Sequence, residues 1–284
     1  MWQDCGQFID QAQSFYNTRN YERAASAFEA ALPVCGPSKK LLLALGQAQL
    51  LAQQFEASVK TFARVVKEDP RDPLPHKLSG DALYLLGKDP EAEAAFKAAL
   101  AVDPKHEPSL YALGRVYYQL NRAPEAAPLF QKVIAMEPGN YRAHDNLALC
   151  YDAMQEDALA LQHFFRALDL VKTAHPDYDW AFANLADFFL RRNQHEKAFQ
   201  LASEAARRNP QGARNFFLTG KALTSLGKDE LSLRWLRQAV ALDPEYGTAH
   251  YLLAQTLKRL GQDEESRKHL EIFKKVNANP RSRR

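Results

Sequence analysis

The chain is poor in cysteine and in long apolar runs, and each shortage excludes a class of protein. Its 284 residues include three cysteines, too few for a disulfide framework and without the paired short spacings of a zinc site. The longest apolar stretches, such as residues 41–45, fall far short of the ~20 residues that a membrane-spanning helix requires. No basic and apolar leader opens the sequence. We therefore expect a protein without a membrane span.

An excess of charge of one sign is also lacking. The chain has 37 basic and 34 acidic residues, which gives a net charge of +3. That balance is too even for a general phosphate-binding surface, so we expect no nucleic-acid partner. Apolar residues at 46% and charged residues at 25% are typical of a folded globular protein rather than a disordered one.

The motifs of the common enzyme classes are missing too. The sequence has no glycine-rich phosphate loop, no nucleophile elbow and no metal-ligand spacing among its eight histidines. The segments between its apolar runs are too short to build a pocket from loops. We therefore predict that the protein is not an enzyme and that it needs no cofactor and no metal.

What the sequence does contain is a period. Proline recurs in two runs with a spacing of 34 residues, and the runs are separated by one step of 38: Pro70, Pro104 and Pro138, then Pro176, Pro210 and Pro244. One insertion of four residues therefore separates two in-phase runs. Setting each proline at position 32 divides the chain into eight units: 5–38, 39–72, 73–106, 107–140, 141–178, 179–212, 213–246 and 247–280.

Two positions of every unit carry a small residue. Position 8 is Ala12, Gly46, Gly80, Gly114, Ala148, Ala186, Gly220 and Ala254; position 20 is Ala24, Ser58, Ala92, Ala126, Ala160, Ala198, Ser232 and Ser266. Small residues at one point on each of two helices allow their backbones to approach closely. Position 24 is Phe in the first five units. Each unit therefore reads as a tightly crossing antiparallel helical hairpin.

Residues that end helices stand where such a hairpin needs them. Position 15 is a residue type that tolerates the left-handed conformation in five units: Gly87, Asn121, Asn193, Gly227 and Gly261. We expect the first helix of each unit over positions 2 to 14. The second helix should run to about position 30, where the proline of the next connection stops it.

The small residues at positions 8 and 20, an aromatic at position 11 in units such as those of Phe15 and Tyr117, and proline at position 32 resemble the tetratricopeptide repeat. The resemblance covers residues 5–280 and implies an all-α fold, a right-handed α-solenoid or superhelix of eight antiparallel helix-turn-helix repeats. One departure is position 4, often Trp in the family, which is histidine in three units: His76, His144 and His250. The family packs a side chain there, so we interpret these histidines as structural.

Both ends of the repeat array are polar where the inner repeats are apolar. Gln7, Gln11 and Ser14 lie on one face of the first helix, and Lys274 occupies position 28, which is apolar in the other units. We expect a complete, capped and monomeric array. The four inserted residues lie between Ala167 and Pro176, where they either extend a helix by one turn or form a hinge.

The resemblance also implies a binding surface. First helices line the concave face of such a superhelix, and units four to seven place there a mixture of aromatic, basic, acidic and amide side chains: Tyr111, Arg115, Tyr118, Arg142, Asp145, Asn146, Trp180, Asn184, Asp187, Arg191, Arg214, Phe217 and Lys221. Asn146 and Asn184 share position 6, where an asparagine in this family commonly clasps the backbone of an extended peptide. The carboxylate clamp that some members use for chaperone tails is not matched.

We therefore expect a non-enzymatic scaffold that binds an extended peptide or a partner protein on its concave face. One alternative is an adaptor or assembly subunit of an envelope or secretion complex that uses the convex face or the edges. The other is an RNA-binding helical repeat, which is disfavoured because Asp81, Asp145 and Asp187 interrupt the basic character of the inner face.

The compartment depends on two cysteines. Cys5 and Cys35 lie at the two open ends of the first hairpin, where antiparallel helices bring start and finish together, so the fold allows a disulfide between them. Such a bridge would imply an exported or periplasmic protein whose leader has been removed. Two reduced thiols would instead suit a cytoplasmic protein, and the sequence leaves both readings open.

Overall fold

The computed structural model describes residues 2–278, and this part of the chain is helical without a strand. The helices are α1 (Trp2–Asn17), α2 (Tyr21–Cys35), α3 (Lys39–Leu51), α4 (Phe55–Glu68), α5 (Pro73–Leu85), α6 (Asp89–Val102), α7 (Glu107–Gln119), α8 (Ala123–Met136), α9 (Tyr141–Ala153), α10 (Asp157–Ala174), α11 (Trp180–Arg191), α12 (His195–Arg208), α13 (Ala213–Ser225), α14 (Asp229–Leu242), α15 (Gly247–Arg259) and α16 (Asp263–Ala278). The all-α prediction is confirmed. No helix in this range is long and apolar enough to cross a membrane.

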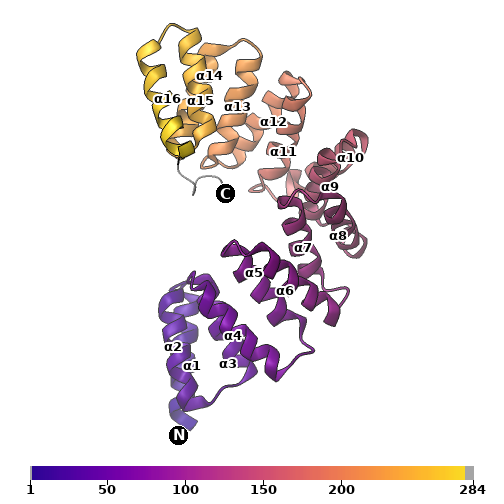
Figure 1. The fold of residues 1–284 in the computed structure, drawn as a ribbon, viewed down its shortest axis with the longest axis vertical. Helices are drawn as coiled ribbons and strands as arrows, with labels where there is room; N and C mark the ends of the chain where they lie inside the picture. The colour runs from indigo at the N-terminus through magenta and orange to yellow at the C-terminus, as the bar shows by residue number, and fades with distance from the viewer. Residues whose placement is uncertain (1, 279–284) are drawn as a thin grey trace. The chain divides into compact units, whose positions relative to one another are not determined.

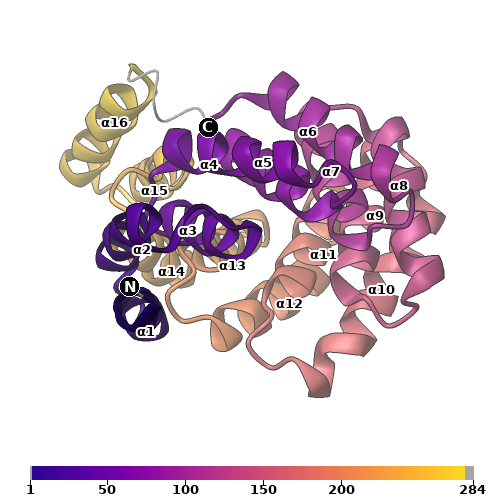
Figure 2. The ribbon, with the colours of Figure 1, turned by 90° about the horizontal axis from the view of Figure 1, so that it is seen from below.

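The helices pair into eight hairpins, each formed by an odd-numbered helix and the next one (Figure 1). The chain divides between Pro138 and Gly139 into two compact units, the first with α1–α8 and the second with α9–α16. Within each unit the second helix of one hairpin also packs against the first helix of the next, as α4 does against α5 (Figure 2). The sequence had suggested a hinge at the insertion, but the division falls one hairpin before it.

The turn inside each hairpin has the same backbone form in all eight repeats. Position 15 has a positive φ throughout: Arg19, Gln53, Gly87, Asn121, Gln155, Asn193, Gly227 and Gly261. The amide of the following residue then donates to a carbonyl five residues back, as Lys88 does to Leu83 at 2.9 Å. This is the bond that closes a helix through a left-handed residue. The sequence indicated five of these positions and missed Arg19, Gln53 and Gln155, whose residue types give no signal.

Replacing Gln53 or Gln155 by glycine is expected to raise the free energy of unfolding by about 0.5–1 kcal/mol each, because a side chain at positive φ is strained and glycine is not. Urea unfolding followed by circular dichroism measures the change. Gly227→Ala, at the same position of another repeat, should lower stability by about 1 kcal/mol. A destabilising Gln→Gly change at both sites would contradict this account of the turn.

In the hairpins with glycine at position 8, the side chain at position 24 leaves no room for a larger residue there. A Cβ atom added to Gly46 or Gly80 would lie 2.5 Å from the Phe ring at position 24 of the same hairpin. Where position 20 is serine, its hydroxyl donates to the backbone carbonyl at position 8, as Ser58 does to Gly46 at 3.0 Å. Ser232 and Ser266 repeat this bond at 2.9 and 2.8 Å. A buried hydroxyl is thus satisfied across the helix crossing.

The insertion lengthens α10, which has 18 residues where its counterparts α4, α6, α8, α12 and α14 have 14. The interpretation as one added helical turn is confirmed. Its end is capped by Arg208 of α12, whose guanidinium donates to the carbonyls of Val171, Lys172, His175 and Pro176 at 3.0–3.4 Å. The same guanidinium lies 4.2 Å from the centre of the Phe182 ring. A positive group at a helix C-terminus is electrostatically favourable.

The terminal hairpins carry the polar side chains expected of them. Gln7, Gln11, Ser14 and Lys274 are all exposed, whereas Leu41 and Leu45, which correspond to the first two, are buried. A disulfide joins Cys5 to Cys35, with 5.2 Å between the Cα atoms. Residues 279 and 280 of the last repeat lie outside the described residues.

Candidate functional site

The first helices of the second unit lie side by side and carry most of the predicted binding residues. Helix α11 contacts α9 on one side and α13 on the other. The ten predicted residues in this unit are Arg142, Asp145 and Asn146 on α9; Trp180, Asn184, Asp187 and Arg191 on α11; and Arg214, Phe217 and Lys221 on α13. We call this side of the second unit the first-helix face.

Two of these residues are buried and form a polar chain beneath the face. The Tyr178 hydroxyl and the Asn184 amide Nδ2 both donate to Asp145 Oδ2, at 2.9 and 3.0 Å. Asn184 Oδ1 in turn accepts a hydrogen bond from Arg214 Nη1 at 3.0 Å. Asp145 is 2% exposed and Asn184 is 4% exposed. Three hairpins are therefore linked through two buried side chains, Asp145 and Asn184, and the half-buried Arg214.

Both position-6 asparagines make hydrogen bonds within the protein. The Asn184 amide uses its nitrogen on Asp145 and its oxygen on Arg214, so it is not presented to a peptide in this structure. The Asn146 amide donates to the Arg142 carbonyl of its own helix at 2.8 Å. Asn184 thus acts as a positioning residue that fixes the Arg214 guanidinium. A sequence places an asparagine on a face but does not show which contacts occupy its amide.

Burial dominates the electrostatics of Asp145. Desolvation raises the pKa of its carboxyl from the ordinary 3.8 to about 6, although the hydrogen bonds from Asn184 and Tyr178 and the charge of Arg214 act in the opposite direction. Its second oxygen, Oδ1, is buried and has no hydrogen-bond partner among the described residues. With a pKa of about 6, this carboxyl takes up a proton at a higher pH than an exposed aspartate does.

Above this polar chain lie aromatic and basic side chains that reach solvent. Trp180 is 54% exposed, and the Arg214 guanidinium carbon lies 5.5 Å from its ring centre. Phe217 is half-buried and packs against Tyr246 with 5.1 Å between ring centres, and Lys221 Nζ lies 6.0 Å from the Phe217 ring. We call Trp180, Arg214, Phe217 and Lys221 the aromatic–basic surface.

The remaining charges of this face pair with one another. Arg191 binds Asp152 at 2.7 Å and Asp187 at 3.4 Å, and Arg192 binds the other oxygen of Asp152 at 3.0 Å. The Asp152 side chain is 4% exposed, so this pair is not a loose surface contact. Asp187 and Arg191 thus belong to an ion-pair network whose centre, Asp152, the sequence did not single out.

The other three predicted residues lie on α7 and so belong to the first unit. Arg115 lies 5.8 Å from the Tyr84 ring, whose hydroxyl donates to Gln119. Tyr111 packs edge-on against the Phe130 ring with centres 5.7 Å apart, and Tyr118 is half-buried. Nearby in the sequence, Asp81 pairs with Lys77 at 2.6 Å, and burial raises the pKa of Asp81.

Two of the three position-4 histidines, His144 and His250, contact a histidine at position 23 of the same repeat. The Nδ1 atoms of His144 and His163 lie 2.9 Å apart, and those of His250 and His269 lie 2.8 Å apart. Both pairs bridge the two helices of a hairpin, as the structural interpretation of position 4 requires. In residues 2–278 no group of three or more His, Cys, Asp or Glu side chains is arranged to hold a metal ion.

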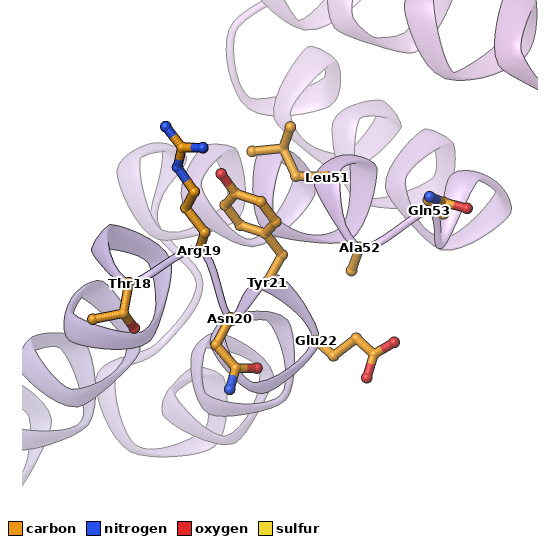
Figure 3. Close-up of a pocket in the computed structure, with 8 residues that line it drawn as sticks. All are labelled: Thr18, Arg19, Asn20, Tyr21, Glu22, Leu51, Ala52 and Gln53. Carbon is orange, nitrogen blue, oxygen red and sulfur yellow. The ribbon is translucent and has the colours of Figure 1, made fainter. Parts of the chain in front are cut away.

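An open hollow of about 600 Å³ occurs in the first unit, where the turns of the first two hairpins face each other. Figure 3 shows its wall, with Thr18, Arg19, Asn20, Tyr21 and Glu22 from one turn and Leu51, Ala52 and Gln53 from the other. Most of this wall is polar, and it includes none of the predicted binding residues.

Comparisons with known structures give the same fold. A tetratricopeptide repeat protein from Parabacteroides merdae is 17% identical, with a TM-score of 0.74 over 90% of this chain and 99% of that one. PilW, a type IV pilus biogenesis factor, is 22% identical, with a TM-score of 0.66 over 77% and 98%. PilF of Pseudomonas aeruginosa is 20% identical, with a TM-score of 0.61 over 72% and 92%. At these identities the likenesses show the fold alone.

Comparisons of sequence assign the family. No curated protein sequence matches the chain significantly. A family model described as TPR repeat matches residues 220–261. A second model, described as tetratricopeptide repeat, matches residues 9–73, 43–107 and 111–179, which together are more than half of the chain. The chain belongs to the tetratricopeptide repeat family.

Proposed function

We propose that this protein–protein interaction scaffold binds an extended peptide segment of a partner protein on the first-helix face of its second unit and has no catalytic activity of its own. The observation that carries the proposal is the exposure of Trp180, whose side chain is 54% exposed. It lies beside Arg214, and a hydrogen bond to the buried Asn184 holds that arginine in place. A large aromatic side chain costs free energy when it faces water without use.

The composition of the surface also suits protein recognition. Tryptophan and arginine are the residue types that most often dominate the energy of protein interfaces. Because Asn184 fixes Arg214, less side-chain entropy is lost when a partner binds than for a free arginine. Phe217 extends the apolar area along α13, and Tyr246 supports its ring.

The proposal is tested by the double variant Trp180→Ala with Phe217→Ala. The native chain is immobilised, partner proteins from its own cells are captured, and quantitative mass spectrometry compares their recovery on native and variant chains. We expect recovery of the partners that bind the native chain to fall about tenfold or more, as for the loss of interface anchors. The matched control is Leu231→Ala on α14, where an exposed leucine is removed from a second helix.

The control also addresses a second candidate function. An assembly subunit that binds through its second helices is favoured by Leu231 and Phe165, which are 61% and 48% exposed on α14 and α10. PilW, a pilus biogenesis factor, shares the fold. If partner recovery falls with Leu231→Ala and stays unchanged with the double variant, the second-helix surface is the binding site and the first proposal is wrong.

A further inference from the structure

We propose that the segment bound by the aromatic–basic surface is acidic, with two carboxylate side chains separated by two apolar residues. This inference rests on the proposed function and adds the chemistry of the partner to it. It follows from which charges of the face are already paired, from the way Arg214 is held and from the spacing of the cations along α13.

Most charges near the surface are neutralised within the protein. Asp152 and Asp187 pair with Arg191 and Arg192, and on the neighbouring helix Arg259 pairs with Asp229 at 2.8 Å. Arg214 and Lys221 differ, because neither has a carboxylate oxygen within 4.0 Å in the described part of the chain. Asp145 attracts Arg214 through space, but the hydrogen bond that Arg214 makes here goes to the intervening Asn184 amide and not to that carboxylate. The unpaired charge of the surface is therefore positive.

Arg214 is held in a way that leaves most of its donors for a ligand. One hydrogen bond, from Nη1 to the Asn184 amide oxygen, fixes the guanidinium. Its acceptor is a neutral amide, so the positive charge is not cancelled. A guanidinium has five N–H donors in a planar fork that matches the two oxygens of a carboxylate. The Trp180 ring lies beside it, with 5.5 Å between the guanidinium carbon and the ring centre.

The second cation stands at a spacing that an extended peptide matches. Arg214, Phe217 and Lys221 are at i, i+3 and i+7 of α13, and so lie along one side of the helix. A seven-residue step along a helix is about 10 Å. In an extended polyproline-type strand, residues three apart project from the same side with a separation of about 9 Å. Two acidic residues separated by two others would thus contact Arg214 and Lys221, with apolar side chains between them on Phe217 and Trp180.

A nucleic acid is the main rival occupant, since arginine and tryptophan also contact phosphates and bases. Because Asp152 and Asp187 neutralise Arg191 and Arg192, these arginines do not extend the basic surface into a track along which a polyanion could lie. A peptide with two acidic side chains meets only the two unpaired cations. The observations favour the peptide, and single-stranded RNA is included as a competitor in the test.

The experiment selects random peptides displayed on phage against the full chain and then measures binding of the selected peptides by fluorescence anisotropy. We expect the selected sequences to be enriched in Asp and Glu beside aromatic or aliphatic residues. Replacement of both acidic residues of a selected peptide by their amides should weaken binding about tenfold or more. Arg214→Gln with Lys221→Gln should remove that difference, whereas the control Lys197→Gln with Arg207→Gln, which removes two exposed charges from α12, should preserve it.

The outcomes separate this inference from the function on which it rests. Selected peptides that lose binding with Trp180→Ala and Phe217→Ala but are not acidic would overturn the inference and leave the proposed function standing. Peptides that are insensitive to those two changes, or a selection that returns no binding peptide, would overturn both. Displacement of the acidic peptides by polyuridylate at a lower concentration than by unlabelled peptide would assign the surface to RNA. Thermal unfolding of each variant shows that it is folded.

Discussion

Phe164→Ala is expected to lower the free energy of unfolding of the second unit by about 3–5 kcal/mol. The Phe164 side chain is completely buried at position 24 of its hairpin, and its ring meets that of Phe188 edge-on with centres 5.5 Å apart. It is surrounded by small residues, among them Ala148, Ala160 and Ala167. Their methyl groups do not reach into the space that the ring would leave, so the loss of apolar burial is joined by the cost of a cavity.

The adjoining residue provides the control. Phe165 lies on the same helix and is 48% exposed, so Phe165→Ala should change stability by less than about 1 kcal/mol. Urea unfolding gives the free energies, and hydrogen exchange locates the effect. Because repeats contact mainly their neighbours, faster exchange should appear in α9–α12 and be absent from α1–α4. Similar losses for both variants would mean that position 24 is not the centre of the hairpin core.

The repeat itself was predictable from the sequence because steric demands recur at fixed positions. At Gly46 and Gly80 an added Cβ would lie 2.5 Å from the ring of Phe62 or Phe96. The close helix crossing therefore excludes larger residues at these positions, and the sequence shows glycine there. The ends of the first helices followed in the same way wherever glycine or asparagine stood at position 15. Gln53 takes the same left-handed conformation because the surrounding hairpin imposes it, and the residue type does not reveal this.

The candidate site was predictable only as a face. The period places Asn184, Arg214 and Asp145 on the first helices of their repeats, and the structure agrees. The period does not tell which side chains lie beneath the surface, because the partners of each are 30 or more residues away in other hairpins. The role of Arg208 was not predictable for the same reason, since the carbonyls that it caps become available only at the end of α10, in another hairpin. Exposure and hydrogen-bond satisfaction are properties of the packed hairpins, not of a single repeat.

Two buried groups of the second unit should give opposite slopes in the dependence of stability on pH. Burial raises the pKa of Asp145 from 3.8 to about 6, so the folded protein takes up this proton before the unfolded chain does. The resulting stability is fully present below about pH 4 and is lost as the pH rises through about 6. Burial and the neighbouring His144 lower the pKa of His163 from 6.5 to about 4. Its contribution is present above pH 6.5 and is lost as the pH falls through about 4.

The two contributions therefore oppose each other between about pH 4 and 6, each on the order of 2 kcal/mol. In Asp145→Asn, the difference in stability from the native chain should shift in favour of the variant as the pH rises from 4 to 6 and then level off. In His163→Gln, the difference should shift in favour of the native chain over nearly the same interval, because the variant lacks the imidazole that charges more easily when unfolded. Both substitutions keep a polar group able to bond to the existing partners, Tyr178 and Asn184 in one case and His144 in the other.

Urea unfolding at a series of pH values measures both differences, and a Phe165→Ala chain supplies a variant without a titrating group at the altered site. The comparison is made as a difference from the native protein because carboxylates elsewhere, such as Glu93 with its pKa lowered to about 2, tilt the stability of every variant alike. The double variant should show the sum of the two changes, since Asp145 bonds to Tyr178 and Asn184 whereas His163 contacts His144. Slopes of the same sign for the two single variants would show that burial does not govern one of these groups. The sign of each slope, more than its size, thus tests whether these groups are removed from water in the folded protein, as the 2% exposure of Asp145 indicates for the polar chain under Arg214.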